Sequence, residues 1–490
     1  MSKIVLGKDL ELNLSKLNKH GFITGSTGSG KTITLKVITE KLSKSGVPVF
    51  LSDIKGDLAS LIEKAVIDEN ISNRVNKLNI EDYEPRAFDA EFFDVFGENG
   101  IPLRTRISDM GPILLSKLMG LNDIQEGVLN IAFRLADERN LLLIDIKDLR
   151  AVLNFVNDNK KELSTIYGNI STASIGAILR SLLIIEQQGG NLFFGEPAFD
   201  ISDFFRQNSN GEGIINILFA KKLIEYPKLY TIFMLWLLSS IYEKLPEVGD
   251  LDKPKMVFFF DEAHLIFDTK DKILEDKLES IVRLIRSKGV GVFFVTQKAT
   301  DIPEDILAQL SNRIQHSLRA YTPKEQKEVK AIAYSFRQDG SENLVDTILN
   351  LKTGEAVFSI LDEDSKPTIA KKSMIYPPES KIGAADISNI LQKINQSNLY
   401  EKYAEYIDNE SAYEILTQEA VDKAKKEEEL KVQEEIKKAE EKVKKEEEKT
   451  QNRKSNRMTP LERFTANLIG SIGRSIGNQI TRGIFGNRKR

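Results

Sequence analysis

The 490-residue sequence contains no cysteine, one tryptophan and three histidines. The absence of cysteine excludes disulfides, thiolate metal sites and cysteine nucleophiles. The histidines stand far apart, at His20, His264 and His316, so each fits a structural role better than a metal site. The sequence has no apolar run long enough to span a bilayer and no signal-peptide pattern at its start. We therefore expect a cytoplasmic protein without a transmembrane segment.

No charge of one sign dominates the chain. Its 69 Lys and Arg residues face 73 Asp and Glu residues, for a formal net charge of −4. A nucleic-acid partner would therefore have to use a local basic patch. The hydrophobic fraction of 41% is ample for a packed core, and the length allows several domains or one large α/β unit with insertions.

The most specific motif is a glycine-rich loop of the form G-x-x-x-x-G-K-T. Its residues are Gly25, Ser26, Thr27, Gly28, Ser29, Gly30, Lys31 and Thr32. Glycines let backbone N–H groups turn toward phosphate oxygens, Lys31 can reach the β- and γ-phosphates, and Thr32 can ligate Mg²⁺. An apolar strand is expected before the loop, at residues 21–24, and a helix after it, at residues 31–44. The loop predicts a site for ATP and Mg²⁺ at a helix N-terminus, and the alternative is a chance match in a Gly/Ser loop.

A second motif is the apolar run at residues 257–260, which ends in Asp261 and Glu262. The run predicts a buried strand whose tip carries both carboxylates, as in a Walker B motif. Asp261 would hold Mg²⁺ through its water shell, and Glu262 would polarise the attacking water. Many buried strands end in an acid, so the prediction depends on the presence of the phosphate loop.

Two further strand ends carry polar side chains where α/β sheets bind ligands. The strand expected at residues 47–51 is followed by Asp53, which can touch the Mg²⁺ water shell or cap the local turn. The strand expected at residues 290–295 is followed by Gln297, which can contact the γ-phosphate or the attacking water, or act as a cap. These alternatives remain open at the level of sequence.

Arginine suits the stabilisation of transferred phosphoryl charge, from the same subunit or from a neighbour. The candidates are Arg283, Arg286, Arg313 and Arg319. Each alone fits a surface ion pair better, but we expect one of the four to act as an arginine finger.

Composition shifts suggest five segments. The first and third form an α/β nucleotide-binding core, and the second is mainly helical. The fourth is a charged helical linker, and the fifth is a basic amphipathic Gly-rich tail. Their expected bounds are 1–100, 101–210, 211–376, 377–457 and 458–490. The tail has apolar residues every four positions, interrupted by glycines, and can bind a protein helix, an anionic membrane surface or DNA.

Taken together, several segments resemble the HerA–FtsK superfamily of P-loop ATPases, and in particular the bacterial HerA-like proteins of the YjgR type. The matching segments are H-G-F-I-T-G with the phosphate loop, S-D-I-K-G-D, F-F-F-D-E-A-H-L-I-F, R-L-I-R-S-K-G-V-G-V-F-F-V-T-Q and N-R-I-Q-H-S-L-R-A-Y-T-P-K. The resemblance covers about residues 1 to 380, and the tail is also similar.

The resemblance implies an α/β, RecA-like (ASCE) P-loop NTPase core. Apolar periodicity and composition add the expectation of a helical insertion and of a C-terminal helical or disordered extension. The resemblance also implies ATP hydrolysis, a homo-oligomeric ring that is commonly a hexamer, and a motor acting on DNA. It assigns Lys31 and Thr32 to Walker A, Asp261 and Glu262 to Walker B, and Gln297 to the sensor. Arg286 best fits the trans-acting arginine, with Arg313 and Arg319 as further candidates.

One departure concerns the start of the chain. HerA helicases carry an N-terminal β-barrel before the ATPase core, whereas here the phosphate loop begins at Gly25. We therefore expect no barrel of that kind, which argues against docking of a nuclease in the HerA manner. A nucleotide-switched scaffold that recruits a partner through its tail is the alternative to a DNA motor.

Overall fold

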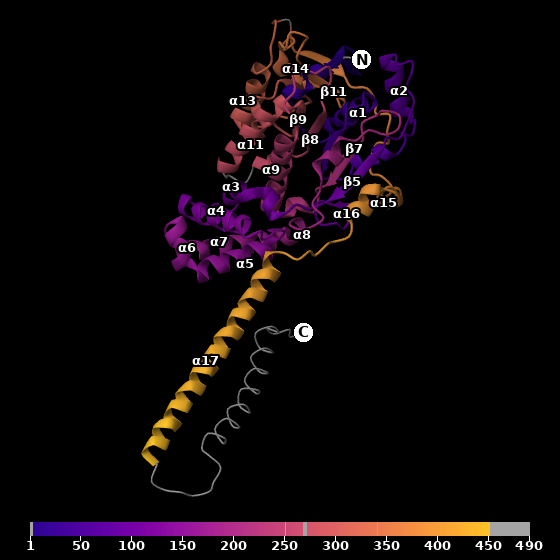
Figure 1. The fold of residues 1–490 in the computed structure, drawn as a ribbon. Helices are drawn as coiled ribbons and strands as arrows, with labels where there is room; N and C mark the ends of the chain where they lie inside the picture. The colour runs from indigo at the N-terminus through magenta and orange to yellow at the C-terminus, as the bar shows by residue number, and fades with distance from the viewer. Residues whose placement is uncertain (1–2, 250, 268–271, 341, 451–490) are drawn as a thin grey trace. The chain divides into compact units, whose positions relative to one another are not determined.

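The computed structural model describes residues 3–249, 251–267, 272–340 and 342–450. The chain divides into two compact units, Met1–Tyr413 and Glu414–Arg490. The first unit is built on a large, mainly parallel sheet with helices on both faces (Figure 1).

The sheet has ten strands in the order β12-β11-β10-β3-β9-β8-β4-β7-β5-β6. All neighbours from β10 to β6 pair parallel, whereas β11 pairs antiparallel with both β10 and β12. The strands are β3 (Gly21–Thr24), β4 (Val49–Asp53), β5 (Ala90–Asp94), β6 (Ile101–Pro102), β7 (Ile215–Phe219), β8 (Met256–Phe260), β9 (Val290–Thr296), β10 (Asn312–Gln315), β11 (Glu355–Ser359) and β12 (Lys371–Met374).

The central strands are buried on both faces, which explains their continuous apolar sequences. β8 reads MVFFF and β9 reads VGVFFVT, and every residue of both strands is buried. Phenylalanine rings from adjacent strands pack together, such as Phe259 with Phe293 at a centroid distance of 5.1 Å. The strand that enters the phosphate loop, β3, lies between β10 and β9, and β9 separates it from β8. This order is the RecA-like (ASCE) arrangement and confirms the predicted fold class.

A hairpin of β1 (Lys3–Gly7) and β2 (Leu10–Asn13) forms a separate two-stranded sheet at the start of the chain. The helices of the first unit outside residues 107–193 are α1 (Lys31–Lys44), α2 (Glu69–Leu78), α9 (Pro227–Lys244), α10 (His264–Phe267), α11 (Lys272–Ile285), α12 (Glu304–Leu307), α13 (Pro323–Tyr334), α14 (Leu344–Asn350), α15 (Ile387–Asn395) and α16 (Asn398–Tyr403). Short 3₁₀ segments are η1 (Leu14–Lys19), η2 (Leu58–Ile62), η4 (Ile201–Phe205), η5 (Leu223–Glu225), η6 (Arg286–Lys288) and η7 (Ala299–Asp301).

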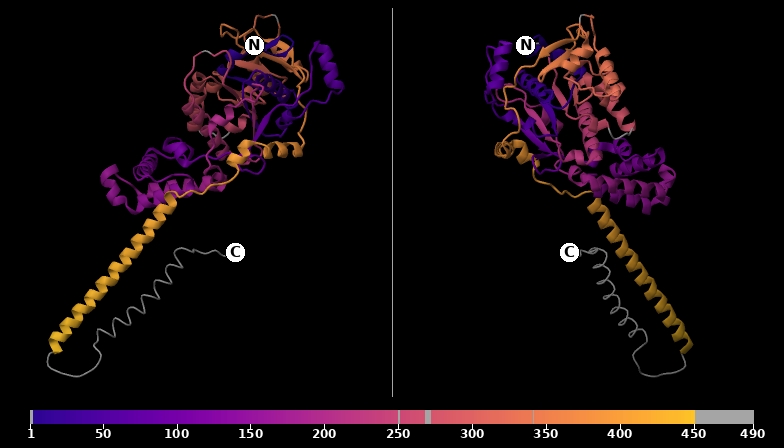
Figure 2. Two further views of the ribbon diagram at one scale, coloured as in Figure 1. Left: turned by 45° about the vertical axis from the view of Figure 1, so that its right-hand side comes forward. Right: turned by 180° about the vertical axis from the view of Figure 1, so that it is seen from behind.

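Between β6 and β7 the chain is mainly helical. The helices gather in one group, which both views of Figure 2 show apart from the sheet. They are α3 (Ile107–Leu118), α4 (Asp123–Glu138), α5 (Ile146–Asp158), α6 (Lys160–Tyr167), α7 (Thr172–Ile185), the π-type turn η3 (Glu186–Gly190) and α8 (Asn191–Phe193).

Residues just beyond 377 are hydrogen-bonded to α1, although the sequence suggested that a linker begins there. The buried carboxylate of Glu40 accepts hydrogen bonds from the backbone N–H groups of Glu379 and Ser380, at 2.9 and 3.0 Å, and from the Ser380 hydroxyl. Lys41 adds an ion pair to Glu379 at 2.8 Å. The first compact unit accordingly extends to Tyr413.

The long helix α17 (Ala412–Thr450) supplies the described part of the second unit. Its sequence interleaves Lys and Glu, and most of its side chains up to residue 442 are exposed. The predicted tail, residues 458–490, lies outside the described residues. Of the helices that the structure describes, none alone has the length and apolarity to cross a membrane, although Lys160–Tyr167 and Thr172–Phe193 pass that test as a pair bent by 100°.

Candidate functional site

The phosphate loop leaves β3 at the carboxyl edge of the sheet and enters α1. Two backbone hydrogen bonds fix it to the neighbouring strand ends. Gly25 N–H donates to the Gln297 carbonyl at 3.2 Å, and Ser26 N–H donates to the Ser317 carbonyl at 2.9 Å. A Cβ atom on Gly25 would lie 2.5 Å from the Cβ of His316, so only glycine fits this approach.

The N-terminus of α1 is open toward the loop. Its N-cap, Gly30, has φ +113° and no side chain to accept the first N–H groups of the helix. The hydroxyl oxygen of Ser29 is also buried without a hydrogen-bond partner among the described residues. Unpaired N–H groups at the positive end of a helix dipole attract an anion. This cradle therefore fits the phosphates of a nucleotide.

The ammonium group of Lys31 is folded back over the loop. It donates to the carbonyl oxygens of Gly25 and Ser26, and the residue is only 8% exposed. Burial lowers the pKa of Lys31, while the nearby carboxylates of Glu262 and Asp261 act in the opposite direction. The group thus lies at the mouth of the cradle, where its charge can compensate phosphate charge.

Strand β8 delivers Asp261 and Glu262 to the same edge of the sheet. The backbone N–H of Glu262 donates to the Asp261 carboxylate at 2.9 Å. Burial, reinforced by the charge of Glu262, raises the pKa of Asp261 to about 6. A bound divalent cation would offset this cost, and Mg²⁺ characteristically uses one or two carboxylates together with substrate phosphates. No cluster of three acidic or histidine side chains that could hold a metal occurs in the part of the chain that the structure describes.

Glu262 is held in an uncommon conformation. Its φ is +46°, in the left-handed region that costs energy for a residue with a side chain. One carboxylate oxygen, Oε1, accepts a hydrogen bond from the ammonium group of Lys55 at 2.6 Å. The other, Oε2, is buried without a hydrogen bond from any described residue, with Nδ1 of His264 at 3.4 Å. Burial would raise the pKa of Glu262, but the bonded Lys55 outweighs it and the pKa lies below the ordinary value.

Asp53 lies at the end of β4, where the sequence left two roles open. Its carboxylate accepts backbone N–H groups from Gly56 at 2.8 Å, Leu58 at 3.0 Å and Ala59 at 3.2 Å. Both oxygens therefore cap the turn that carries Lys55. The geometry favours the capping role over a place in the Mg²⁺ shell.

Gln297 follows β9 with an exposed side chain, and its backbone carbonyl accepts the N–H of Gly25. It therefore lies directly beside the loop. Thr32 is half-buried in the first turn of α1. The structure brings both of these predicted residues to the edge of the sheet that holds Lys31, Asp261 and Glu262.

The four candidate arginines occupy different places. Arg283 is exposed in the last turn of α11. Arg313 donates hydrogen bonds to the carbonyls of Leu310 at 3.2 Å and Ser335 at 2.9 Å. Its guanidinium also lies over the ring of Phe22, so all of these partners are within the fold of its own chain. Arg319 is exposed and follows β10, two residues after Ser317, whose carbonyl accepts the N–H of Ser26 in the phosphate loop. Arg286 is exposed in η6, before β9 begins, and therefore at the opposite edge.

Sequence reasoning did not assign three further residues to the site, two that contact the loop and its helix and one that contacts Glu262. The ring of His316 bonds to the Thr34 hydroxyl and to the Glu355 carbonyl, each at 2.9 Å. Gly354 N–H donates to the Ser29 carbonyl at 3.0 Å. The third is Lys55, whose only signal was its position beyond the end of a buried strand, next to Asp53.

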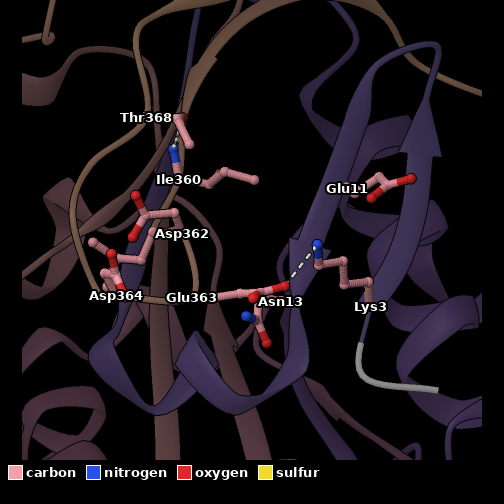
Figure 3. A pocket seen from close by; sticks show the side chains of 9 residues that line it. Lys3, Glu11, Asn13, Ile360, Asp362, Glu363, Asp364 and Thr368 are labelled. Atoms are coloured by element: carbon pink, nitrogen blue, oxygen red, sulfur yellow. Dashed lines mark hydrogen bonds and ion pairs between the residues drawn. The ribbon is translucent and has the colours of Figure 1, made fainter.

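A cavity of about 390 Å³ lies elsewhere, between the β1–β2 hairpin and the loop after β11 (Figure 3). No residue of the phosphate loop lines it. Because β11 runs antiparallel to β10, this loop lies at the amino edge of the parallel strands. The cavity is lined by Lys3 and by the acidic side chains of Glu11, Asp362, Glu363 and Asp364. It is thus separate from the candidate nucleotide site.

Comparisons with known proteins give a consistent picture. A family model described as "Helicase HerA-like C-terminal" matches residues 2–490. The DNA double-strand break repair helicase HerA of Sulfurisphaera tokodaii is 25% identical over 369 residues, which make up 72% of this chain and 65% of that helicase. The helicase of the same name from Sulfolobus acidocaldarius is 24% identical over 400 residues, 77% of this chain and 69% of that protein.

Similar solved structures include the plasmid coupling protein TrwB in complex with ADP and Mg²⁺, at 14% identity and a TM-score of 0.48 over 78% of this chain and 90% of that one. VirB4 of Thermoanaerobacter pseudethanolicus is 17% identical, with a TM-score of 0.46 over 78% of this chain and 97% of that one. The family model spans almost the entire sequence and agrees with the phosphate loop, the Walker B strand and their strand order. The chain belongs to the helicase HerA-like C-terminal family of P-loop ATPases.

Proposed function

We propose that the protein is a Mg²⁺-dependent ATPase that assembles into a hexameric ring and works as a motor on DNA, in the manner of a helicase or translocase. The observation that carries this proposal is the convergence of an open helix N-terminus, Lys31 and the Asp261–Glu262 pair at one edge of the sheet. The cytoplasmic location expected from the sequence is part of the same proposal.

Each residue then has a distinct role. The backbone of Gly25–Gly30 and the ammonium of Lys31 bind the phosphates, and the Thr32 hydroxyl and Asp261 hold Mg²⁺, which supplies charge neutralisation at the phosphates. Glu262 accepts a hydrogen bond from the attacking water and orients it. Gln297 contacts the γ-phosphate or that water from the tip of β9.

The proposal includes a shared active site between subunits. Strand β9 is seven residues long, or about 23 Å at 3.3 Å per residue. Arg286 lies beyond its amino end, so its side chain does not reach the phosphate loop of its own chain. If Arg286 is the finger, it acts on the site of a neighbouring subunit, as ring assembly would allow. Arg319, exposed at the edge of the loop, is the candidate within the same chain.

Action on DNA is supported by the names of the relatives, which are DNA repair helicases. The chain has no overall positive charge, so contact with phosphates of DNA would depend on local basic side chains. The alternative function is a nucleotide-switched scaffold that recruits a protein or an anionic membrane through its tail. The 39-residue charged helix α17 favours it, because a solvated helix of that length can serve as a spacer before the tail.

One experiment separates the two functions. ATP turnover is measured without DNA, with double-stranded DNA and with single-stranded DNA at fixed salt, alongside the mass of the protein in solution. A motor on DNA predicts a ring-sized mass and stimulated turnover. If neither form of DNA changes the rate of ATP turnover and the protein still has the mass of a ring, the result supports the scaffold. Absence of any ATP turnover contradicts the proposed ATPase activity itself.

A further inference from the structure

Lys55 forms an ion pair with the proposed catalytic carboxylate, yet neither Walker motif contains it. It lies in the turn after β4, and its ammonium is 2.6 Å from Oε1 of Glu262. The Lys55 side chain is 45% exposed, whereas that of Glu262 is 9% exposed. The ion pair therefore joins a solvent-accessible cation to a buried anion across two adjacent strands, β4 and β8.

The turn that presents Lys55 is rigidly built. Asp53 accepts the N–H groups of Gly56, Leu58 and Ala59, which closes the chain on both sides of Lys55. Gly56 has φ +83°, as the turn requires. A lysine in a closed turn loses less freedom on pairing than one on a loose loop, so the contact with Glu262 is built into the fold.

The pair also governs how Glu262 can act. Its left-handed backbone fixes the direction of the side chain, and Lys55 occupies Oε1 with a charge-assisted hydrogen bond. A carboxylate oxygen engaged by an ammonium group is a weaker acceptor for a proton of water. Orientation of the attacking water by Oε1 therefore requires that Lys55 release it.

We propose that Lys55 is a positioning residue that holds Glu262 in a resting arrangement and keeps basal turnover low until the pair opens. This inference rests on the proposed ATPase function and assigns a control element to the same site.

The test compares Lys55→Met, which keeps the length and removes the charge, with Lys55→Arg, which keeps the charge. The matched control is Lys117→Met, which removes a lysine that pairs with Glu126 at 3.0 Å in the helical group. We expect Lys55→Met to raise basal kcat about fivefold, or about 1 kcal/mol at 1.36 kcal/mol per tenfold change, with KM for ATP nearly unchanged. Lys55→Arg and Lys117→Met should turn over like the wild type.

A second readout uses the protein without nucleotide. The midpoint of urea unfolding is compared for Lys55→Met, Glu262→Gln and the double variant. If the pair forms, the double variant loses less than the two single losses combined, because either change alone already breaks the contact. A third readout uses the protein with nucleotide. The affinity for ADP, measured by calorimetry, should be the same in Lys55→Met as in the wild type.

The outcomes separate this inference from the ATPase proposal. A wild type without turnover contradicts the proposed function, whereas an active wild type with an unchanged or slower Lys55→Met overturns the inference. Lower kcat together with weaker ADP binding would show that Lys55 is a phosphate ligand instead. Additive losses in unfolding would show that the two side chains do not interact.

Discussion

At the scale of single residues, the phosphate loop and the Walker B pair were predictable because each depends on a short, contiguous pattern. Lys31 and Glu262 are placed by the strand or helix on which they lie. The role of Asp53 could not be predicted from the sequence, because a carboxylate after a strand can cap a turn or face a metal. Only the three N–H groups around it show that it caps. The Lys55–Glu262 pair joins positions 207 residues apart, which no local pattern encodes.

The two proposed catalytic residues should fail in different ways. Lys31→Ala removes the ammonium that compensates phosphate charge, so nucleotide affinity should fall below detection in calorimetry. Glu262→Gln keeps the shape of the side chain but loses its carboxylate, so ATP should still bind while turnover drops at least about 100-fold. Glu262→Gln with turnover close to that of the wild type would exclude Glu262 from the catalytic role.

His20 makes stability depend on pH. Its Nε2 lies 2.7 Å from the Val282 carbonyl, and its Nδ1 accepts the Val292 N–H at 3.0 Å, so the neutral ring fits and the charged ring does not. Burial lowers the pKa of His20 to about 4 from 6.5. Between these two pH values the unfolded chain binds the proton and the folded chain does not. The free energy of unfolding should therefore decrease as pH falls through this range, by on the order of 3 kcal/mol for this residue.

The variant His20→Asn tests this dependence. Its amide oxygen can accept the Val292 N–H, and asparagine tolerates the φ of +56° at this position. It carries no titrating group, so the slope of unfolding free energy against pH, from urea unfolding between pH 4 and 6.5, should become shallower. The remaining slope belongs in part to His316, whose pKa burial also lowers to about 4. Equal slopes in variant and wild type would contradict the assignment to His20.

At the scale of elements, the long apolar strands were predictable and the short polar ones were not. The sequence placed the helix at residues 31–44 and strands at 257–260 and 290–295, close to α1, β8 and β9. Strand β10, with the sequence NRIQ, has no apolar run and is held in the sheet by pairing with β3 and β11. The order of the strands depends on contacts between distant segments, so the resemblance to a family was needed to anticipate it.

Strand β9 also determines how Arg286 can be tested. Strand β9 separates Arg286 from the phosphate loop of its own chain. An oligomer made only of Arg286→Ala subunits should therefore lose ATP turnover at every interface between subunits, while each phosphate loop retains its affinity for ATP. Mixing these subunits with Glu262→Gln subunits should restore part of the activity, because some interfaces then contain both an intact arginine and an intact glutamate. Turnover is measured across mixing ratios at constant total protein.

Two results would contradict the shared site at Arg286. Mixed subunits that show only the sum of the two separate activities would exclude complementation. A wild type that is fully active as a monomer would exclude a neighbour altogether. Arg319→Ala serves as the comparison, because loss of an arginine that acts within its own chain cannot be complemented by Glu262→Gln subunits: no site in that mixture contains both an intact arginine and an intact glutamate.

At the scale of the whole molecule, the first compact unit contains every residue of the proposed site, from Gly25 to Arg319. Its C-terminal part is hydrogen-bonded to α1, because the buried carboxylate of Glu40 accepts the backbone N–H groups of Glu379 and Ser380. The sequence did not suggest this contact, because the residues that form it lie far apart along the chain. Composition did identify the Lys- and Glu-rich segment that forms α17. Catalysis and any recruitment through the tail should therefore be separable by truncation.

Deletion of residues 458–490 tests that separation. The apolar residues of this tail recur every four positions, so at 100° per residue they drift by about 40° per step around a helix. Its glycines weaken a helix by about 1 kcal/mol each relative to alanine, so ordering would require a partner that buries the apolar side chains. The truncated protein should keep basal ATPase and its unfolding midpoint but lose association with anionic liposomes or a protein partner. Co-sedimentation of both forms with liposomes and with DNA at matched salt measures this, and joint loss of ATPase and ring formation would instead assign the tail to the assembly of the core.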